Sequence, residues 1–444
     1  MQCHNAVVAV VKVVEVVDMN DRRAVDVVVV GGGLAGLTAA AFAARSGSSV
    51  VVLDSHGLGG RARTATVEGF RFNQGPHALY ETGEAMAVLS ELGVPVPGGA
   101  PSRTIGVIVD GVRQRFPVGA GSMLHTGALS ARGKAAAARL LAALPKHDAS
   151  KVTGMTVNEW IAARKLPDDA AALVHVLIRV STYANAPELL DAGAVVQQLQ
   201  RALKGVRYLD GGWQDMVDGV AATAAAAGAE ITDHVAVDRI ERAGDGWALS
   251  TAAGEVRARS VVLAAGGPRV AARLLGIELS ALGDPGPAAR ATCLELGLDT
   301  RPDTPVLFST DAPLYFSTHM PPARLGPAGT TVVHVAKYLA PGEAPPPDVG
   351  ARELWDHARA AGVAPGSSSV LASRYLHDMT VTFGIPLARR GGFRGRPPVA
   401  GNARPGCFLA GDWVGSEGML LDAAMASARH AAEQAVGQAA LVTP

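Results

Sequence analysis

Residues 26–36 read DVVVVGGGLAG, a short run of β-branched residues that passes directly into three glycines. An uninterrupted apolar run of this length is typical of a buried parallel strand. Alanine-rich sequence with helical spacing continues to Arg45, and Gly47 is placed to end a helix. A second apolar run, SVVVL at residues 49–53, follows, and Asp54 stands at its end. The stretch therefore predicts a complete β-α-β unit.

The three glycines have the spacing of a dinucleotide-binding turn. Gly31, Gly33 and Gly36 form G-x-G-x-x-G. The first allows the tight turn, the second lets the backbone approach a pyrophosphate, and the third lets the helix pack against the strand. The helix N-terminus offers free N–H groups to the phosphates, and Asp54 lies where a carboxylate accepts hydrogen bonds from an adenosine ribose. A glycine-rich turn in an unrelated α/β protein would lack this context.

Composition narrows the range of functions. The 444 residues include 40 Lys and Arg and 40 Asp and Glu, so the formal net charge is zero, whereas nucleic-acid-binding chains carry a basic excess. The three cysteines, Cys3, Cys293 and Cys407, are far apart and form no C-x-x-C, which predicts neither a disulfide framework nor a metal site. We therefore expect a protein of a reducing, cytoplasmic compartment with no nucleic-acid partner.

Two further segments separate FAD from NAD. Residues 59–64 read GGRART just after the second predicted strand, and Gly411-Asp412 begins the last strand–helix turn. With these motifs the chain resembles the FAD-dependent amine oxidase and phytoene desaturase superfamily, whose members carry G-G-R-x-x-[ST] after the acidic residue and A-G-D before the final helix. The resemblance follows the order of motifs along most of the chain and implies FAD as the cofactor. Cys407 lies inside the strand before Gly411, so no cysteine stands where a thioether to the flavin is expected, and we expect non-covalent FAD.

The resemblance also implies which residues contact the cofactor. They come from six parts of the chain: Gly31, Gly33, Leu34, Ala35 and Gly36 at the pyrophosphate; Asp54 at the ribose; Gly60 and Arg61 along the cofactor; Gly75, Pro76 and His77 beside the isoalloxazine; Val235 at the adenine; and Gly411, Asp412, Gly418, Met419 and Leu420 at the ribityl chain and the pyrimidine end.

The last of these placements has a physical reason. Hydride arriving at flavin N5 leaves negative charge near N1 and the C2 oxygen, and a helix N-terminus directed there stabilises that charge. One departure from the family pattern is Ser427-Ala428, where members often have Ser-Gly.

An interleaved domain organisation is expected, because segments with nucleotide-binding character occur at the beginning, in the middle and at the end of the chain. Residues from about 85 to 204 look helical, and residues 290–385 mix strand patterns with proline-rich loops. We predict an α/β fold with two parts: a discontinuous Rossmann-type FAD-binding domain at 24–84, 205–285 and 395–444, and an inserted mixed α+β substrate domain at 85–204 and 286–394.

The N-terminal residues are expected to be an unstructured extension, residues 1–18. The apolar run at residues 7–17 is too short to span a bilayer and contains Lys12 and Glu15. No small-residue cleavage site of a signal peptide follows it.

Three residues are candidates for catalysis, and each has an ordinary alternative. His77 could be a capped loop histidine, Lys337 a solvated lysine at a strand end, and Tyr375 a core aromatic. His334 and Lys337 are three residues apart, so on a regular strand they face opposite sides.

The predicted reaction is oxidation of an organic substrate. We find no second G-x-G-x-x-G, so electrons are expected to come from the substrate and to leave to oxygen, a quinone or another acceptor. The favoured function is hydride transfer from a hydrophobic small molecule to flavin N5 by a desaturase or dehydrogenase of the phytoene desaturase-like type. Aromatic residues make up only 5% of the chain and no tyrosine follows Gly411, which argues against the tyrosine cage of amine oxidases.

Three alternatives stay open. An amine or protoporphyrinogen-type oxidase is the first, and a non-enzymatic binding protein similar to the GDP-dissociation-inhibitor family is the second. The third concerns location. The helical stretch at 120–146 carries Arg132, Lys134, Arg139 and Lys146 among Leu and Ala. This pattern is compatible with peripheral contact at the inner face of the membrane or with a solvated helix face.

Overall fold

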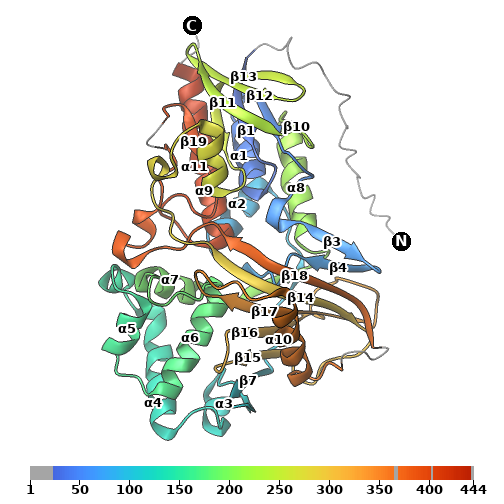
Figure 1. Ribbon diagram of the computed structural model, residues 1–444, viewed down its shortest axis with the longest axis vertical. Helices are drawn as coiled ribbons and strands as arrows, with labels where there is room; N and C mark the ends of the chain where they lie inside the picture. Colours follow the sequence, from blue (N-terminus) through green and yellow to red (C-terminus); the bar gives the residue numbers. More distant parts are fainter. Residues whose placement is uncertain (1–23, 365–368, 402–403, 442–444) are drawn as a thin grey trace.

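The first sheet contains the predicted β-α-β unit and is assembled from three distant parts of the chain. The computed structural model describes residues 24–364, 369–401 and 404–441, so the predicted extension 1–18 lies outside the described residues. Five strands of this sheet are parallel: β10 (Glu230–Thr232), β2 (Val50–Leu53), β1 (Val25–Val30), β13 (Gly254–Leu263) and β19 (Cys407–Leu409). Two more, β12 (Gly246–Thr251) and β11 (Val237–Ala243), continue from β13 as an antiparallel meander. The expected α/β fold with a discontinuous Rossmann-type domain is thereby confirmed (Figure 1).

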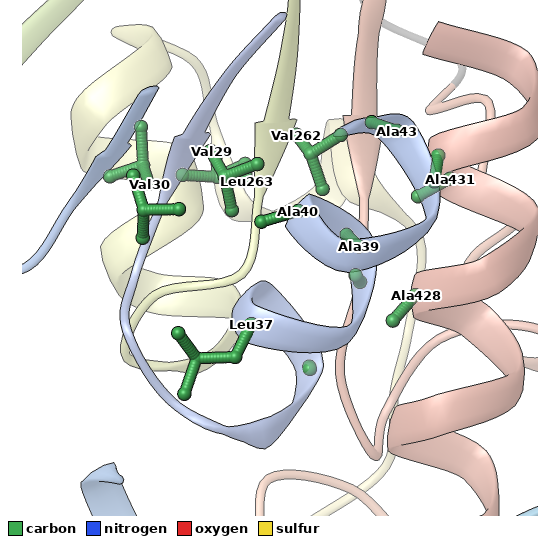
Figure 2. Packing of buried hydrophobic residues seen from close by; sticks show 14 of the residues in the cluster. Val29, Val30, Leu37, Ala39, Ala40, Ala43, Val262, Leu263, Ala428 and Ala431 are labelled. Carbon is green, nitrogen blue, oxygen red and sulfur yellow. The ribbon is translucent and has the colours of Figure 1, made fainter. Parts of the chain in front are cut away.

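Helix α1 (Leu34–Arg45) lies between this sheet and α11 (Leu420–Leu441), the last helix of the chain. Figure 2 shows its small side chains, among them Ala39 and Ala43, near Ala428 and Ala431 of α11, with Val29 and Val262 of the sheet on the other side. Small residues allow the two helices to approach closely, and burial of these apolar surfaces stabilises the layer by roughly 25 cal/mol per Å². The end of the chain therefore braces the turn at its beginning.

The second sheet forms the core of the part that the sequence predicts to be the substrate domain. Its order is β18 (Val370–Thr382), β14 (Ala289–Leu298), β17 (Thr331–Leu339), β16 (Leu314–Met320), β15 (Val306–Ser309), β7 (Ile105–Val109) and β8 (Val112–Arg115). All neighbours are antiparallel except β15 and β7. One face packs against α10 (Pro347–Ala360), and the other faces α4 (Ala131–Ala143), α6 (Asp168–Thr182) and the first domain (Figure 1).

The remaining helices fall into two groups. The predicted substrate domain contains α3 (Ala120–His125), α4, α5 (Val157–Ala163), α6 and α7 (Ala192–Ala202). The first domain contains α2 (Glu84–Leu92), α8 (Trp213–Ala226) and α9 (Gly267–Leu275). Two small sheets join the parts, one of β3 (Thr64–Val67) and β4 (Phe70–Asn73), the other of β5 (Leu79–Tyr80), β9 (Val206–Leu209) and β6 (Gly98–Gly99). Among the described residues, no helix is both long and apolar enough to cross a bilayer.

Two features differ from the predicted organisation. Helix α2 packs against α8 and α11, although residues 85–204 were expected in the substrate domain. The hairpin β7–β8 also lies within that stretch, which was expected to be helical. Asp110 and Gly111 occupy its turn with φ of +50° and +74°, and this Asp-Gly pair directly after the apolar run IGVIV is a hairpin signal that could have been read from the sequence. The domain boundaries themselves stay a prediction.

Candidate functional site

The turn from β1 into α1 has no room for side chains at two of its glycines. Gly31 has φ of +114°, and a Cβ there would lie 2.8 Å from the carbonyl oxygen of Ala264. A Cβ on Gly36 would overlap the carbonyl oxygen of Gly31, so α1 can pack this closely only with glycine at that position. Gly33 begins the helix with no side-chain cap and no acidic residue in the first turn. The N-terminal N–H groups and the positive end of the helix dipole are therefore available to an anionic ligand.

Asp54 and Val235 lie together at the end of β2. The Asp54 carboxylate accepts hydrogen bonds from the backbone N–H of Gly32 at 2.6 Å and of His56 at 2.7 Å. The backbone N–H of Val235 donates to the carbonyl oxygen of Asp54 at 2.8 Å. The structure thus brings the expected ribose and adenine positions next to the glycine turn.

Arg61 and Asp412 form an ion pair although 351 positions separate them in sequence. The Arg61 Nη1 lies 2.6 Å from Oδ2 of Asp412, which is 4% exposed. The same nitrogen donates to the carbonyl oxygen of Val381 at 2.6 Å, and the guanidinium lies 4.3 Å from the centre of the Phe383 ring. Strand β18 of the second sheet therefore ends beside the Arg61–Asp412 ion pair. This pair joins the loop after β2 to the turn before α11.

Two residues that sequence reasoning did not assign hold the turn that contains Asp412. The Ser427 hydroxyl contacts both the N–H and the carbonyl oxygen of Gly411 at 3.0 Å. Arg396, which is 6% exposed, donates to the carbonyl oxygens of Gly415 at 2.8 Å and of Glu417 at 3.0 Å. Burial lowers the pKa of Arg396 to about 10, so the guanidinium still carries its charge at neutral pH. No local motif marks Arg396, because its partners are carbonyl groups.

The start of α11 has an unusual backbone. Gly418 and Leu420 have φ of +61° and +56°, and a positive φ at leucine is a strained conformation of the kind that clusters at functional sites. A Cβ on Gly418 would lie 2.9 Å from Nη1 of Arg201. Met419 is 2% exposed and packs against Phe393. The segment expected at the pyrimidine end of a flavin is therefore a tight turn at a helix N-terminus.

The loop at residues 75–77 rests on the second sheet. The N–H of Gly75 donates to Oε1 of Glu295 at 2.9 Å, and a Cβ on Gly75 would lie 3.0 Å from Sγ of Cys293. Pro76 is buried, and the His77 ring contacts the edge of Trp213 at 4.6 Å between ring centres. Desolvation lowers the pKa of His77 to about 4, so the ring is neutral at pH 7.

Glu295 is the anchor of this loop, and sequence reasoning missed it. Its side chain is fully buried, with Nε of Arg374 at 2.5 Å and Nδ1 of His334 at 3.2 Å. Burial alone would raise the pKa of Glu295, but His334 and the Arg374 guanidinium outweigh that effect and keep the pKa below its ordinary value. Arg374 also donates to the carbonyl oxygen of Asn73 at 2.7 Å. The carboxylate is ionised and its charge is matched by Arg374.

The other two catalytic candidates lie on the opposite face of the second sheet. Lys337 contacts Glu353 of α10 at 2.8 Å and Glu343 at 3.0 Å. The Tyr375 hydroxyl donates to the carbonyl oxygen of Pro347, the first residue of α10, at 2.9 Å. The prediction that His334 and Lys337 face opposite sides is confirmed by their partners. Lys337 and Tyr375 are therefore not carried into the candidate site, because their side chains end against α10.

Tyrosines gather on the face that carries Glu295. The hydroxyls of Tyr208 and Tyr315 lie 3.2 Å apart, and the ring of Tyr338 lies 6.5 Å from that of Tyr315 and 5.9 Å from that of Tyr183. Burial raises the pKa of all four phenols, so they are neutral at pH 7. Four of the six tyrosines of the chain are thus connected in space, which the low aromatic content did not indicate.

The match to a family model decides what this arrangement is. The model of the FAD dependent oxidoreductases matches residues 26–434. The chain belongs to this family. The matched residues include the glycine turn, the Arg61–Asp412 pair and most of α11. The expected resemblance, the FAD cofactor and the oxidoreductase class are therefore confirmed.

The individual relatives and structures are similar in different degrees. A putative flavin-containing monoamine oxidase, AofH of Mycobacterium tuberculosis, is 30% identical over 269 residues, 55% of this chain and 58% of that protein. A carotenoid 3,4-desaturase of Haloarcula japonica is 49% identical over 59 residues, 13% of this chain and 12% of that protein. The chain therefore matches less than two thirds of the length of these relatives.

The solved structures show the fold. Cyclohexylamine oxidase from Brevibacterium oxydans superposes with a TM-score of 0.70 at 18% identity, covering 95% of this chain and 100% of that one. A putative protoporphyrinogen oxidase from Exiguobacterium superposes with a TM-score of 0.64 at 18% identity, covering 92% of this chain and 97% of that one.

The residues present fit FAD. The flavoprotein offers glycines whose Cβ would fill the turn, a helix N-terminus without a capping side chain, and an ion pair beside it. We propose that the segments around Gly31, Asp54, Arg61, Gly75 and Gly418 hold the cofactor in the order that the sequence predicts.

Proposed function

We propose that this flavoprotein oxidises a small, apolar and uncharged organic molecule, with hydride passing from a substrate C–H bond to N5 of FAD. The observation that supports this most directly is the apolar surface that packs against Gly75, in which Cys293 is 1% exposed. It is formed by Cys293 and Met379, whose Sγ and Cε atoms lie 3.0 and 3.1 Å from where a Gly75 Cβ would be. A charged substrate would find no counter-charge in these two side chains.

The charged groups nearest this surface neutralise each other. Glu295 and Arg374 are in contact at 2.5 Å, and Lys337 is paired with two glutamates on the other face. Bound FAD supplies the hydride acceptor. The side chains of this surface orient the substrate and exclude water, and a C–H bond held roughly 3–3.5 Å from the acceptor needs no strong base. This favours a desaturase or dehydrogenase, with oxygen or a quinone as electron acceptor.

An amine oxidase is the second candidate, and the connected tyrosines favour it. Tyr183, Tyr208, Tyr315 and Tyr338 give an apolar aromatic wall that would also accept a neutral amine. The 30% identity to the putative monoamine oxidase also supports an amine as the substrate. The binding-protein alternative is not retained, because the family is one of oxidoreductases.

Anaerobic titration of the purified yellow protein separates the two candidates. Samples receive either a linear polyene dispersed in detergent or cyclohexylamine, and the flavin band is followed before and after admission of air. Bleaching by the polyene alone supports the desaturase, and bleaching by the amine alone supports the amine oxidase. Recovery of the band in air identifies oxygen as an acceptor. A protein without a flavin spectrum after incubation with FAD would contradict both candidates.

Neighbouring residues of β17 give a matched pair of variants. Tyr338 and Lys337 face opposite sides of the sheet, so Tyr338→Ala should slow flavin reduction by the active substrate at least about tenfold, whereas Lys337→Met should leave the rate within about twofold. Rapid-mixing absorbance at the flavin band measures both. Equal effects of the two variants would show that the wrong face of the sheet has been assigned to the substrate.

A further inference from the structure

A hollow of about 430 Å³ lies between α4 and α5. These helices lie at the opposite end of the molecule from β1 and α1 (Figure 1). Cationic side chains line the hollow from two helices: Arg132 and Arg139 of α4, and Arg164 and Lys165 at the end of α5. His147, in the loop between these helices, also lines it. None of these residues belongs to the proposed flavin or substrate site. No carboxylate is part of the lining.

The spacing of the two arginines of α4 allows both to contact the same ligand. Arg132 and Arg139 are seven residues apart, which is about two turns, so both lie on one face of the helix. Arg139 donates to the carbonyl oxygen of Ala135 in its own helix at 3.3 Å. Within the described ranges, neither arginine has an ion pair with a carboxylate. Their charge is left for a ligand.

Arg164 is the innermost of these cations. Its guanidinium lies 4.5 Å from the centre of the Trp160 ring, and its Nη2 lies 3.1 Å from Nε2 of His147. Burial lowers the pKa of Arg164, and burial together with the Arg164 charge lowers the pKa of His147. Among the residues that the structure describes, no carboxylate pairs with Arg164. The lowered pKa leaves His147 neutral at pH 7, so its Nε2 accepts from Arg164, and a negative group placed here would supply the ionic partner that the Arg164 guanidinium lacks.

The floor of the hollow is apolar. Trp160 is 1% exposed, and its indole N–H has no hydrogen-bond partner among the described residues. Leu140 and Leu144 line the hollow beside it. The arginine and lysine side chains of the wall are donors only, and donors of this kind gain from a ligand that accepts hydrogen bonds.

We propose that this hollow binds the phosphate group of a small molecule that carries a short hydrocarbon body. The arginine forks match phosphate oxygens in geometry and charge, and the volume exceeds that of a bare phosphate, so the hydrocarbon part occupies the space over Leu140 and Leu144. The phosphate comes either from a soluble ester or from a lipid headgroup. The site is independent of the redox reaction, and its ligand is not the substrate.

Calorimetric titration of the FAD-loaded protein with octyl phosphate tests the proposal. The variants are Arg139→Gln and Arg164→Gln, each of which removes one cation from the wall, and the matched control is Arg239→Gln on β11, whose side chain is 68% exposed. We expect one site per chain in the unchanged protein and the control, and about tenfold weaker binding in both wall variants. Octanol should not bind, because it lacks the phosphate.

A second arm separates the two sources of phosphate. Sedimentation with phosphatidylcholine vesicles, with and without phosphatidic acid, is compared for the same four proteins. Binding to the acidic vesicles that Arg139→Gln and Arg164→Gln weaken identifies a lipid headgroup, and binding of octyl phosphate alone identifies a soluble ester. The proposal is overturned if octyl phosphate and the acidic vesicles both fail to bind, or if all four proteins bind equally well.

Discussion

At the scale of residues, one ion pair connects the two ends of the proposed flavin-binding path. Arg61 comes from the loop after β2 and Asp412 from the turn before α11, and the buried carboxylate has Arg61 as its ionic partner. Removing one member leaves the other with an unmatched charge or unmatched donors, which costs far more than the pair itself contributes. Cofactor retention is therefore sensitive to either residue.

Arg61→Ala should weaken FAD binding by roughly tenfold or more, because charge-assisted hydrogen bonds are lost along the cofactor. Titration of the apoprotein with FAD, followed by quenching of flavin fluorescence, measures this. Arg63→Ala is the matched control, since Arg63 lies in the same loop with an exposed side chain. Full FAD affinity in Arg61→Ala would mean that the cofactor takes a different path.

Glu295 is the second residue whose removal has a directed consequence. Glu295→Gln leaves Arg374 unmatched and should lower the free energy of unfolding by about 3 kcal/mol at pH 7. The folded pKa of Glu295 lies below its ordinary value, so its stabilising contribution is complete above about pH 4.5 and declines as the pH falls through the folded pKa. The variant should therefore lose less stability than the unchanged protein as the pH falls below 4.5.

Urea denaturation across this pH range measures both effects. Glu241→Gln on β11 is the control, because its side chain is 57% exposed and its ion pair with Arg239 contributes little. A Glu295→Gln variant as stable as the unchanged protein at pH 7 would show that the charge of Arg374 finds another partner.

At the scale of elements, two glycines within helices differ in whether a side chain would fit in their place. A Cβ on Gly36 of α1 overlaps the carbonyl oxygen of Gly31, whereas nothing lies within 4 Å of a Cβ on Gly437 of α11. Gly36→Ala should destabilise the protein by about 3 kcal/mol or more and abolish FAD binding. Gly437→Ala should stabilise it by about 0.5–1 kcal/mol. Thermal unfolding with and without FAD compares them, and a tolerated Gly36→Ala would refute the close packing of α1 on β1.

The contact of α10 with the second sheet depends on a neutral histidine. His357 is 3% exposed, and its Nε2 lies 3.1 Å from the carbonyl oxygen of Leu307. Burial lowers the pKa of His357 to about 4. The unfolded chain binds a proton at its ordinary pKa near 6.5, so stability is complete above that pH and declines as the pH falls from 6.5 toward 4.

His357→Gln should reduce the pH dependence of the free energy of unfolding by the contribution of about one bound proton per chain. This contribution amounts to about 3 kcal/mol by pH 4. The glutamine amide can still donate to Leu307, so the variant should remain folded at pH 7. Chemical denaturation at several pH values between 7 and 4 gives the slope. An unchanged slope would show that His357 is protonated in the folded protein.

At the scale of the whole molecule, the second sheet has one face for α10 and one for the flavin-binding domain. Side chains alternate along its strands, so Lys337 and Tyr338 belong to different surfaces although they are neighbours in sequence. This division explains why two of the three predicted catalytic candidates do not reach the candidate site. It also leaves the α4–α5 end free for a separate ligand site.

The sequence by itself determined the β-α-β unit, the family resemblance and the expected FAD contacts near Gly31, Arg61 and Asp412. These features are local: the spacing of glycines, the apolar runs and the turn residues depend on chain geometry over a few residues. The Asp110-Gly111 hairpin was equally local and was simply not recognised.

Only the tertiary structure decided the environment of the proposed substrate site. Glu295 lies 79 positions from Arg374 and 220 from Gly75, and no local pattern specifies that three such residues meet. The four connected tyrosines are likewise brought together by the register of β9, β16 and β17 and by the end of α6, so a low count of aromatic residues carried no information about their density. Side-chain partners at this distance follow from how sheets and helices pack, and burial then sets which of them are ionised.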